Sequence, residues 1–178
     1  MRKASQSCLY ADACKIAGED PAADKPTRRV IMSASQQQLR FAIAAFSSSS
    51  AAVKAAQDLQ TVSRLAGSIS YLGSRSALNA RTSLLELPFP NNAQPLACTE
   101  GEVAQRLARK LDSGALTLQS ALTTWLIPRH ALQLERAVEN GEILVWVQLY
   151  DSEDEQNAYR ILLSAGCTLV GVHDLVKS

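Results

Sequence analysis

The sequence predicts an α+β fold in which a strand-helix-strand unit occurs twice, and three observations predict it. Two apolar stretches, residues 41–46 and 142–150, each precede a segment with apolar side chains at helical spacing. Each of these segments ends at a glycine, Gly67 or Gly166, and a further apolar stretch follows. Of the 178 residues, 47% are hydrophobic, which is enough to form a core.

The first unit begins with a strand over residues 41–46. This stretch is apolar on both faces, which suits the centre of a sheet. Four serines follow and can cap a helix. In that helix Ala52, Ala56 and Leu59 recur at three- and four-residue steps, so one face can pack. Residues 68–72 complete the unit as a second strand.

The second unit repeats this order with stronger signals. Residues 142–150 form its first strand and are rich in β-branched and aromatic side chains. Asp151 precedes a cluster of acidic residues, a pattern typical of a helix start. Ala158 and Leu162 mark the buried stripe of this helix, and residues 168–173 form the last strand.

Placed side by side, the two units form a ferredoxin-like sandwich: a four-stranded sheet covered on one face by two helices. A doubly wound parallel sheet is the alternative. The domain covers residues 39–178 and carries a helical insertion at about 99–127, after which Pro128 begins a further helix. Residues 1–38 lack a sustained period and are predicted to form a flexible N-terminal arm.

Composition excludes several classes of protein. With 18 basic and 17 acidic side chains, the chain lacks the basic surplus of a nucleic-acid binder, so we predict no nucleic-acid partner. It has no apolar run of membrane-spanning length and no secretory signal, which predicts a cytoplasmic protein. The cysteines lack the paired spacing of a zinc site, and we predict neither a metal nor a cofactor; they are Cys8, Cys14, Cys98 and Cys167.

The sequence contains two histidines, His130 and His173. His173 precedes Asp174 on the last predicted strand, but neighbours on a strand point to opposite faces, so the pair is not preassembled. His130 lies in the first turn of a helix and is not interpreted as a metal ligand. Common hydrolase and phosphate-loop motifs are absent, and we predict no catalytic residue and no enzyme. If a cleft binds a ligand, its polar groups are Arg129, His173 and Asp174.

The tryptophans are candidates for a partner surface. Trp125 lies in an uncharged stretch, and three interpretations stay open: insertion into the fold, a partner surface, or a membrane anchor. The basic residues Arg106, Arg109 and Lys110 just upstream favour the anchor. Trp146 is surrounded by aliphatic residues on a strand, which indicates core or subunit contact.

Charge is distributed unevenly along the chain. Residues 1–81 contain 11 basic and five acidic side chains, whereas residues 131–178 contain three basic and eight acidic ones. We interpret this polarity as a device that helps the two units dock and can orient contacts between chains.

Several runs of residues resemble the YflT-like general stress protein family of bacteria. They include Pro-Arg-His and Leu-Glu-Arg-Ala within residues 128–137, Asn-Gly-Glu-Ile-Leu-Val at 140–145 and Val-Gly-Val-His-Asp at 170–174. The segment 51–59 resembles the first helix of that family. The family is mostly uncharacterised, and the resemblance implies no catalytic residues.

We therefore predict a non-enzymatic, stress-linked regulatory or protein-interaction module that self-associates as a homo-oligomer or binds a protein partner. One alternative is a small-ligand-binding or catalytic domain that uses a cleft near His173. The other is a peripheral membrane protein attached through an uncharged helix at residues 115–127.

Overall fold

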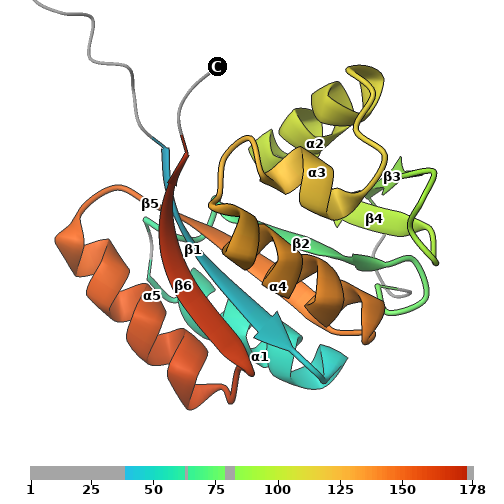
Figure 1. The fold of residues 1–178 in the computed structure, drawn as a ribbon. Helices are drawn as coiled ribbons and strands as arrows, with labels where there is room; N and C mark the ends of the chain where they lie inside the picture. The colour runs from blue at the N-terminus through green and yellow to red at the C-terminus, as the bar shows by residue number, and fades with distance from the viewer. Residues whose placement is uncertain (1–38, 63, 79–82, 176–178) are drawn as a thin grey trace, which may run out of the picture. The chain divides into compact units, whose positions relative to one another are not determined.

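The computed structural model describes residues 39–62, 64–78 and 83–175, and the arm predicted for residues 1–38 lies outside them. A sheet of six strands in the order β3-β4-β2-β5-β1-β6 forms its centre (Figure 1). The strands are β1 (Leu39–Phe46), β2 (Ile69–Ser74), β3 (Leu84–Leu87), β4 (Leu96–Thr99), β5 (Ile143–Leu149) and β6 (Leu169–Leu175). The helices are α1 (Ser49–Gln60), α2 (Glu102–Asp112), α3 (Leu118–Leu122), α4 (Pro128–Glu139) and α5 (Ser152–Ser164).

The two strand-helix-strand units interleave in this sheet. The first strand of the chain, β1, lies between β5 and β6 of the second unit, and β2 pairs with the other side of β5. Each pairing in the described sheet is antiparallel, so the doubly wound parallel alternative is wrong. The α+β class is confirmed.

The four-stranded ferredoxin-like description is wrong, because β3 and β4 extend the sheet beyond β2. Both strands have four residues and border a proline-rich stretch, residues 88–95, which gives no strand signal in the sequence. The prolines flank the strands without interrupting them, and Leu87 pairs with Leu96 with both side chains buried. Short strands at a sheet edge tolerate such flanking prolines.

Helices cover both faces of the sheet (Figure 1). On one face α1 and α5 pack through small side chains such as Ala55 and Ala158 against Ala42 and Ala44 of β1. On the other face α2, α3 and α4 pack against the alternate residues of the same strands. A sheet face open to a partner, which a two-helix sandwich would leave, is therefore not found in the described part of the chain.

The uncharged segment 115–127 is not one helix. Only Leu118–Leu122 is helical, and its first turn is capped by Thr117, whose side chain accepts a hydrogen bond from the backbone N–H of Ser120. Leu118 and Leu122 are fully buried and Leu126 is nearly so. These three leucines thus complete the core, whereas Leu116 and Ile127 of the same segment are exposed. Among the described residues, none of the helices has the length and apolar character needed to cross a membrane.

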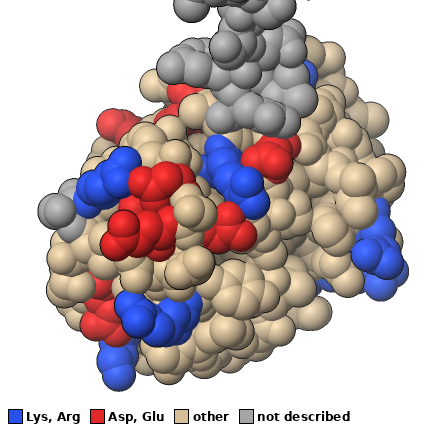
Figure 2. Space-filling view, turned by 90° about the vertical axis from the view of Figure 1, so that its left-hand side faces the viewer, with Lys and Arg blue, Asp and Glu red and all other residues tan. Residues whose placement is uncertain are grey.

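The start of α5 lies where the sequence pattern predicts it, and two ion pairs connect the first unit to the second. Asp151 caps α5, because its side chain accepts hydrogen bonds from the N–H groups of Glu153 and Asp154 at 3.0 and 2.9 Å. The same carboxylate pairs with Arg64 of the first unit. Arg40 of the first unit similarly lies 2.9 Å from Glu155. Figure 2 shows basic and acidic side chains next to one another on one face of the molecule. These pairs join the basic first unit to the acidic second unit within one chain.

Candidate binding site at the two histidines

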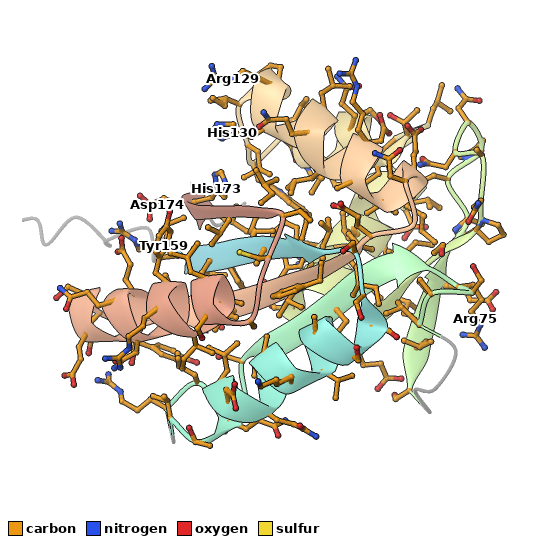
Figure 3. The ribbon with its side chains drawn as sticks, turned by 90° about the horizontal axis from the view of Figure 1, so that it is seen from below. Arg75, Arg129, His130, Tyr159, His173 and Asp174 are labelled. Atoms are coloured by element: carbon orange, nitrogen blue, oxygen red, sulfur yellow. The ribbon has the colours of Figure 1, made fainter. Side chains whose placement is uncertain are left out.

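The fold brings the only two histidines of the sequence together, although 43 positions separate His130 from His173. Their ring centroids lie 5.0 Å apart and the ring planes meet at 71° (Figure 3). His130 belongs to the first turn of α4, which Pro128 begins. His173 lies opposite Phe41 in the pairing of β6 with β1.

The alternation of β6 explains why His173 faces α4. Leu169 and Leu175 on this strand pack into the core beneath α4, whereas Val170 and Val172 pack on the α5 side. His173 lies four residues after Leu169 and two before Leu175. Its side chain is therefore on the same side of β6 as theirs and points toward α4. On α4, His130 precedes the buried Leu134 by four residues and therefore lies on the same stripe of the helix.

A pocket of about 150 Å³ lies between α4 and β6 beside the two rings. Its polar side chains are His130, His173 and Gln133, and its other lining residues are aliphatic or glycine. Among the residues that the structure describes, no carboxylate, lysine or arginine lines it. The lining residues are Ile43, His130, Gln133, Leu134, Leu169, Val170, Gly171, Val172 and His173.

Gly171 provides the space that the His173 ring occupies. A Cβ atom at position 171 would lie 2.9 Å from Nε2 of His173, which is closer than real Cβ contacts allow. The imidazole therefore lies over the glycine, two residues back along the strand, on the pocket side of β6. A methyl group at this position would force the ring to move. The backbone of Gly171 is not in the left-handed region, so the clash with the ring is the main effect of such a substitution.

The surroundings of His173 favour its neutral form. Burial lowers the pKa of His173 from its ordinary value, His130 lowers it further, and Asp174 opposes the shift. Asp174 is exposed and lies 3.8 Å from Arg40 on β1. A neutral imidazole can both donate and accept a hydrogen bond, and it can take up a proton when an anion arrives.

The three predicted ligand-binding residues do not share this pocket. His173 lines it, as the cleft hypothesis requires, but Asp174 points to the other side of β6 and Arg129 is exposed outside the lining residues. All three nevertheless lie at the same edge of the molecule (Figure 3). His130 was not among the predicted residues. Its position four residues before Leu134 was the available signal that it faces the sheet.

The two tryptophans differ in their surroundings. Trp146 is fully buried, and its ring meets Phe41 edge-on with centroids 6.1 Å apart, so it does not form a surface in this chain. Trp125 is half-buried and packs against the same core, with the Arg106 guanidinium carbon 6.0 Å from its ring centroid. The interpretation that Trp125 inserts into the fold agrees with these contacts.

Within the described residues, no cluster of three or more histidine, cysteine, aspartate or glutamate side chains is arranged to hold a metal ion. Cys98 is fully buried in the core, and burial raises the pKa of its thiol to about 12. The thiol therefore stays protonated near neutral pH and is a poor nucleophile.

Comparison of the chain with protein-family models, with curated proteins and with solved structures finds no match.

Proposed function

We propose that the protein is a non-enzymatic regulatory module that binds a small organic acid in the pocket between α4 and β6. One observation carries the proposal: the chain's only two histidines meet, with ring centroids 5.0 Å apart, at a pocket whose other lining residues, apart from Gln133, are aliphatic or glycine. The stress-linked role and the cytoplasmic location that the sequence suggests stay predictions.

The lining residues support an acid as ligand. Because no carboxylate lines the pocket, it offers little to a metal cation. Because no lysine or arginine lines it, a doubly charged anion would also be poorly neutralised. One negative charge can be balanced when an imidazole takes up a proton, and Gln133 can donate a further hydrogen bond. The volume of about 150 Å³ holds roughly five to eight non-hydrogen atoms.

The lining residues also support binding rather than catalysis. Within the described part of the chain, no serine, threonine, cysteine or lysine lines the pocket to serve as a nucleophile, and no carboxylate lines it to orient either imidazole. The aliphatic residues Ile43, Leu134 and Leu169 would instead contact an apolar portion of the ligand.

We expect butyrate to bind more tightly than its neutral isostere butyramide, and more tightly as the pH falls. The titratable or charged groups near His173 are His130 on α4, Asp174 on β6 and Arg40, which faces Asp174 from β1. Since His173 is neutral above its lowered pKa, the imidazole must take up a proton from solvent when the anion binds, and Kd rises about tenfold for each pH unit above that pKa. NMR titration of the histidine Cε1–H signals measures both Kd and protonation.

Two glycine variants locate this binding. Gly171→Ala displaces the His173 ring and should weaken butyrate binding and raise the pKa of His173 toward its ordinary value. Gly67→Ala adds the same methyl group where no atom lies within 4 Å and should change neither. If butyrate moves neither histidine signal, or if the two variants behave alike, the proposal is wrong.

A second candidate function, self-association, is favoured by the free edge of β6. Among the described strands β6 pairs only with β1, so its outer backbone groups can pair with a second copy of the chain. The neighbouring helix α5 exposes Tyr159 and Leu163, at 40% and 51%, and Tyr159 lies beside β6 in Figure 3. An edge-to-edge pair of sheets would bury these side chains.

Sedimentation velocity tests self-association with a matched pair of variants. We expect a dimer for the intact chain and a monomer for Leu163→Glu, because a carboxylate would be buried without a partner. Leu116→Glu should stay dimeric, since Leu116 has the same 51% exposure but precedes α3, away from β6. A monomeric intact chain, at low and at high salt, contradicts this candidate.

A further inference from the structure

Three basic side chains meet Trp125 at a second pocket, away from the histidines. The pocket has a volume of about 240 Å³ and lies between the C-terminal half of α2 and the segment that follows α3. Its lining residues are Arg106, Arg109, Lys110, Ser113 and Trp125. These are the residues whose sequence pattern raised the question of a membrane anchor.

Arg106 is held in a fixed position at this pocket. Its side chain is 4% exposed, and its Nε donates a hydrogen bond of 2.7 Å to Oε1 of Glu102. The guanidinium also lies against the Trp125 ring, at 6.0 Å from the centroid. A buried, oriented guanidinium loses little conformational entropy when it contacts a ligand.

The charge around this pocket favours an anion. Glu102 pairs with Arg106, and its Oε1 also lies 4.0 Å from Nη2 of Arg109. Three cations line the pocket, Glu102 is not among the lining residues, and none of the lining residues is acidic. The C-terminal end of α2 contributes a partial negative charge of about half a unit, which is smaller than the remaining positive charge.

We propose that this pocket binds the phosphate group of a phosphorylated metabolite or of a lipid headgroup. Arginine matches the geometry of phosphate oxygens, and lysine adds a point charge. Arg109 is 61% exposed and can turn toward a ligand. The half-buried Trp125 forms one wall, and its Nε1 is a buried donor without a hydrogen-bond partner among the described residues.

Two exposed apolar residues make the lipid source worth testing separately. Ile127 follows Trp125 by two residues and is 55% exposed, and Leu116 is 51% exposed. Such side chains near a basic site can enter the interface of a bilayer. The phosphate chemistry is the same for both sources, so the experiment has one arm for each.

Glycerol phosphate is the soluble probe, and the indole N–H signal of Trp125 in NMR spectra reports its binding. We expect saturable binding to the intact chain and a loss of about tenfold or more in affinity for the double variant Arg109→Gln/Lys110→Gln. Both side chains lie at the protein surface, so the fold is expected to survive, and circular dichroism checks this. The control Lys54→Gln/Arg75→Gln removes two exposed basic charges elsewhere, on α1 and after β2, and should bind like the intact chain.

The lipid arm uses co-sedimentation with phosphatidylcholine vesicles that contain phosphatidylinositol phosphate, compared with pure phosphatidylcholine. Binding to the phosphorylated vesicles that the Arg109/Lys110 variant loses identifies a headgroup, whereas binding of glycerol phosphate alone identifies a soluble ligand. If the intact chain binds neither probe, or if the control variant weakens binding as much, the proposal is wrong.

Discussion

Replacement of Trp146 by alanine is expected to lower the free energy of unfolding by about 3–5 kcal/mol, the range for a large side chain removed from a core. Trp146 is fully buried on β5, at the centre of the sheet, and packs edge-on against Phe41. The cavity would lie beneath α4, where neighbouring helices cannot close it without moving. Denaturant unfolding followed by circular dichroism measures the loss.

Two further variants make this measurement decisive. Trp125→Ala removes the same atoms from a half-buried position and should lose clearly less stability. Trp146→Phe keeps most of the packing and removes an indole N–H that has no hydrogen-bond partner among the described residues. Its loss of stability should therefore be smaller than that of either alanine variant. An alanine variant at 146 that is no less stable than the one at 125 would mean that Trp146 is not a core residue.

The second large effect is expected for Leu134→Ala, which should cost about 2–5 kcal/mol and also disturb the histidine pocket. Leu134 is 2% exposed, lies on the buried stripe of α4 and forms part of the pocket wall. Truncation removes the largest of the buried apolar side chains through which α4 packs on the sheet. Because His130 lies one turn earlier on the same stripe, its distance from His173 should increase.

Leu132 provides the control on the same helix. It is half-buried, so Leu132→Ala should cost about 1 kcal/mol or less and leave the rings in contact. Denaturant unfolding measures stability, and a nuclear Overhauser effect between the two imidazoles measures their contact. A Leu134→Ala variant that keeps both its stability and the contact between the two imidazoles would contradict the role of α4 in positioning His130.

Much of the central sheet could be predicted from the sequence because its signals are local and strong. Asp151 followed by acidic residues marks the start of α5, and the apolar runs of β1 and β5 mark buried strands. β3 and β4 have no such signal. Each has four residues and borders a proline-rich stretch; β4 is a strand because it pairs with β2, and β3 because it pairs with β4.

The candidate site was predictable only in part, because its geometry depends on long-range packing. His173 could be singled out from the sequence, since it ends an apolar strand. Its partner His130 could not, because nothing local shows that α4 crosses above β6. Asp174, adjacent in sequence, lies on the other side of β6, as the alternation of side chains along a strand predicts.

The position of β1 at the middle of the sheet has a consequence for how the protein is made. On both sides β1 pairs only with β5 and β6, so Phe46 meets Ile143 and Ala45 meets Leu169. During synthesis this largely apolar strand therefore leaves the ribosome long before either of its neighbours exists. Until the last residues emerge, this nascent segment has two unpaired edges, and we expect it to depend on chaperones to avoid aggregation.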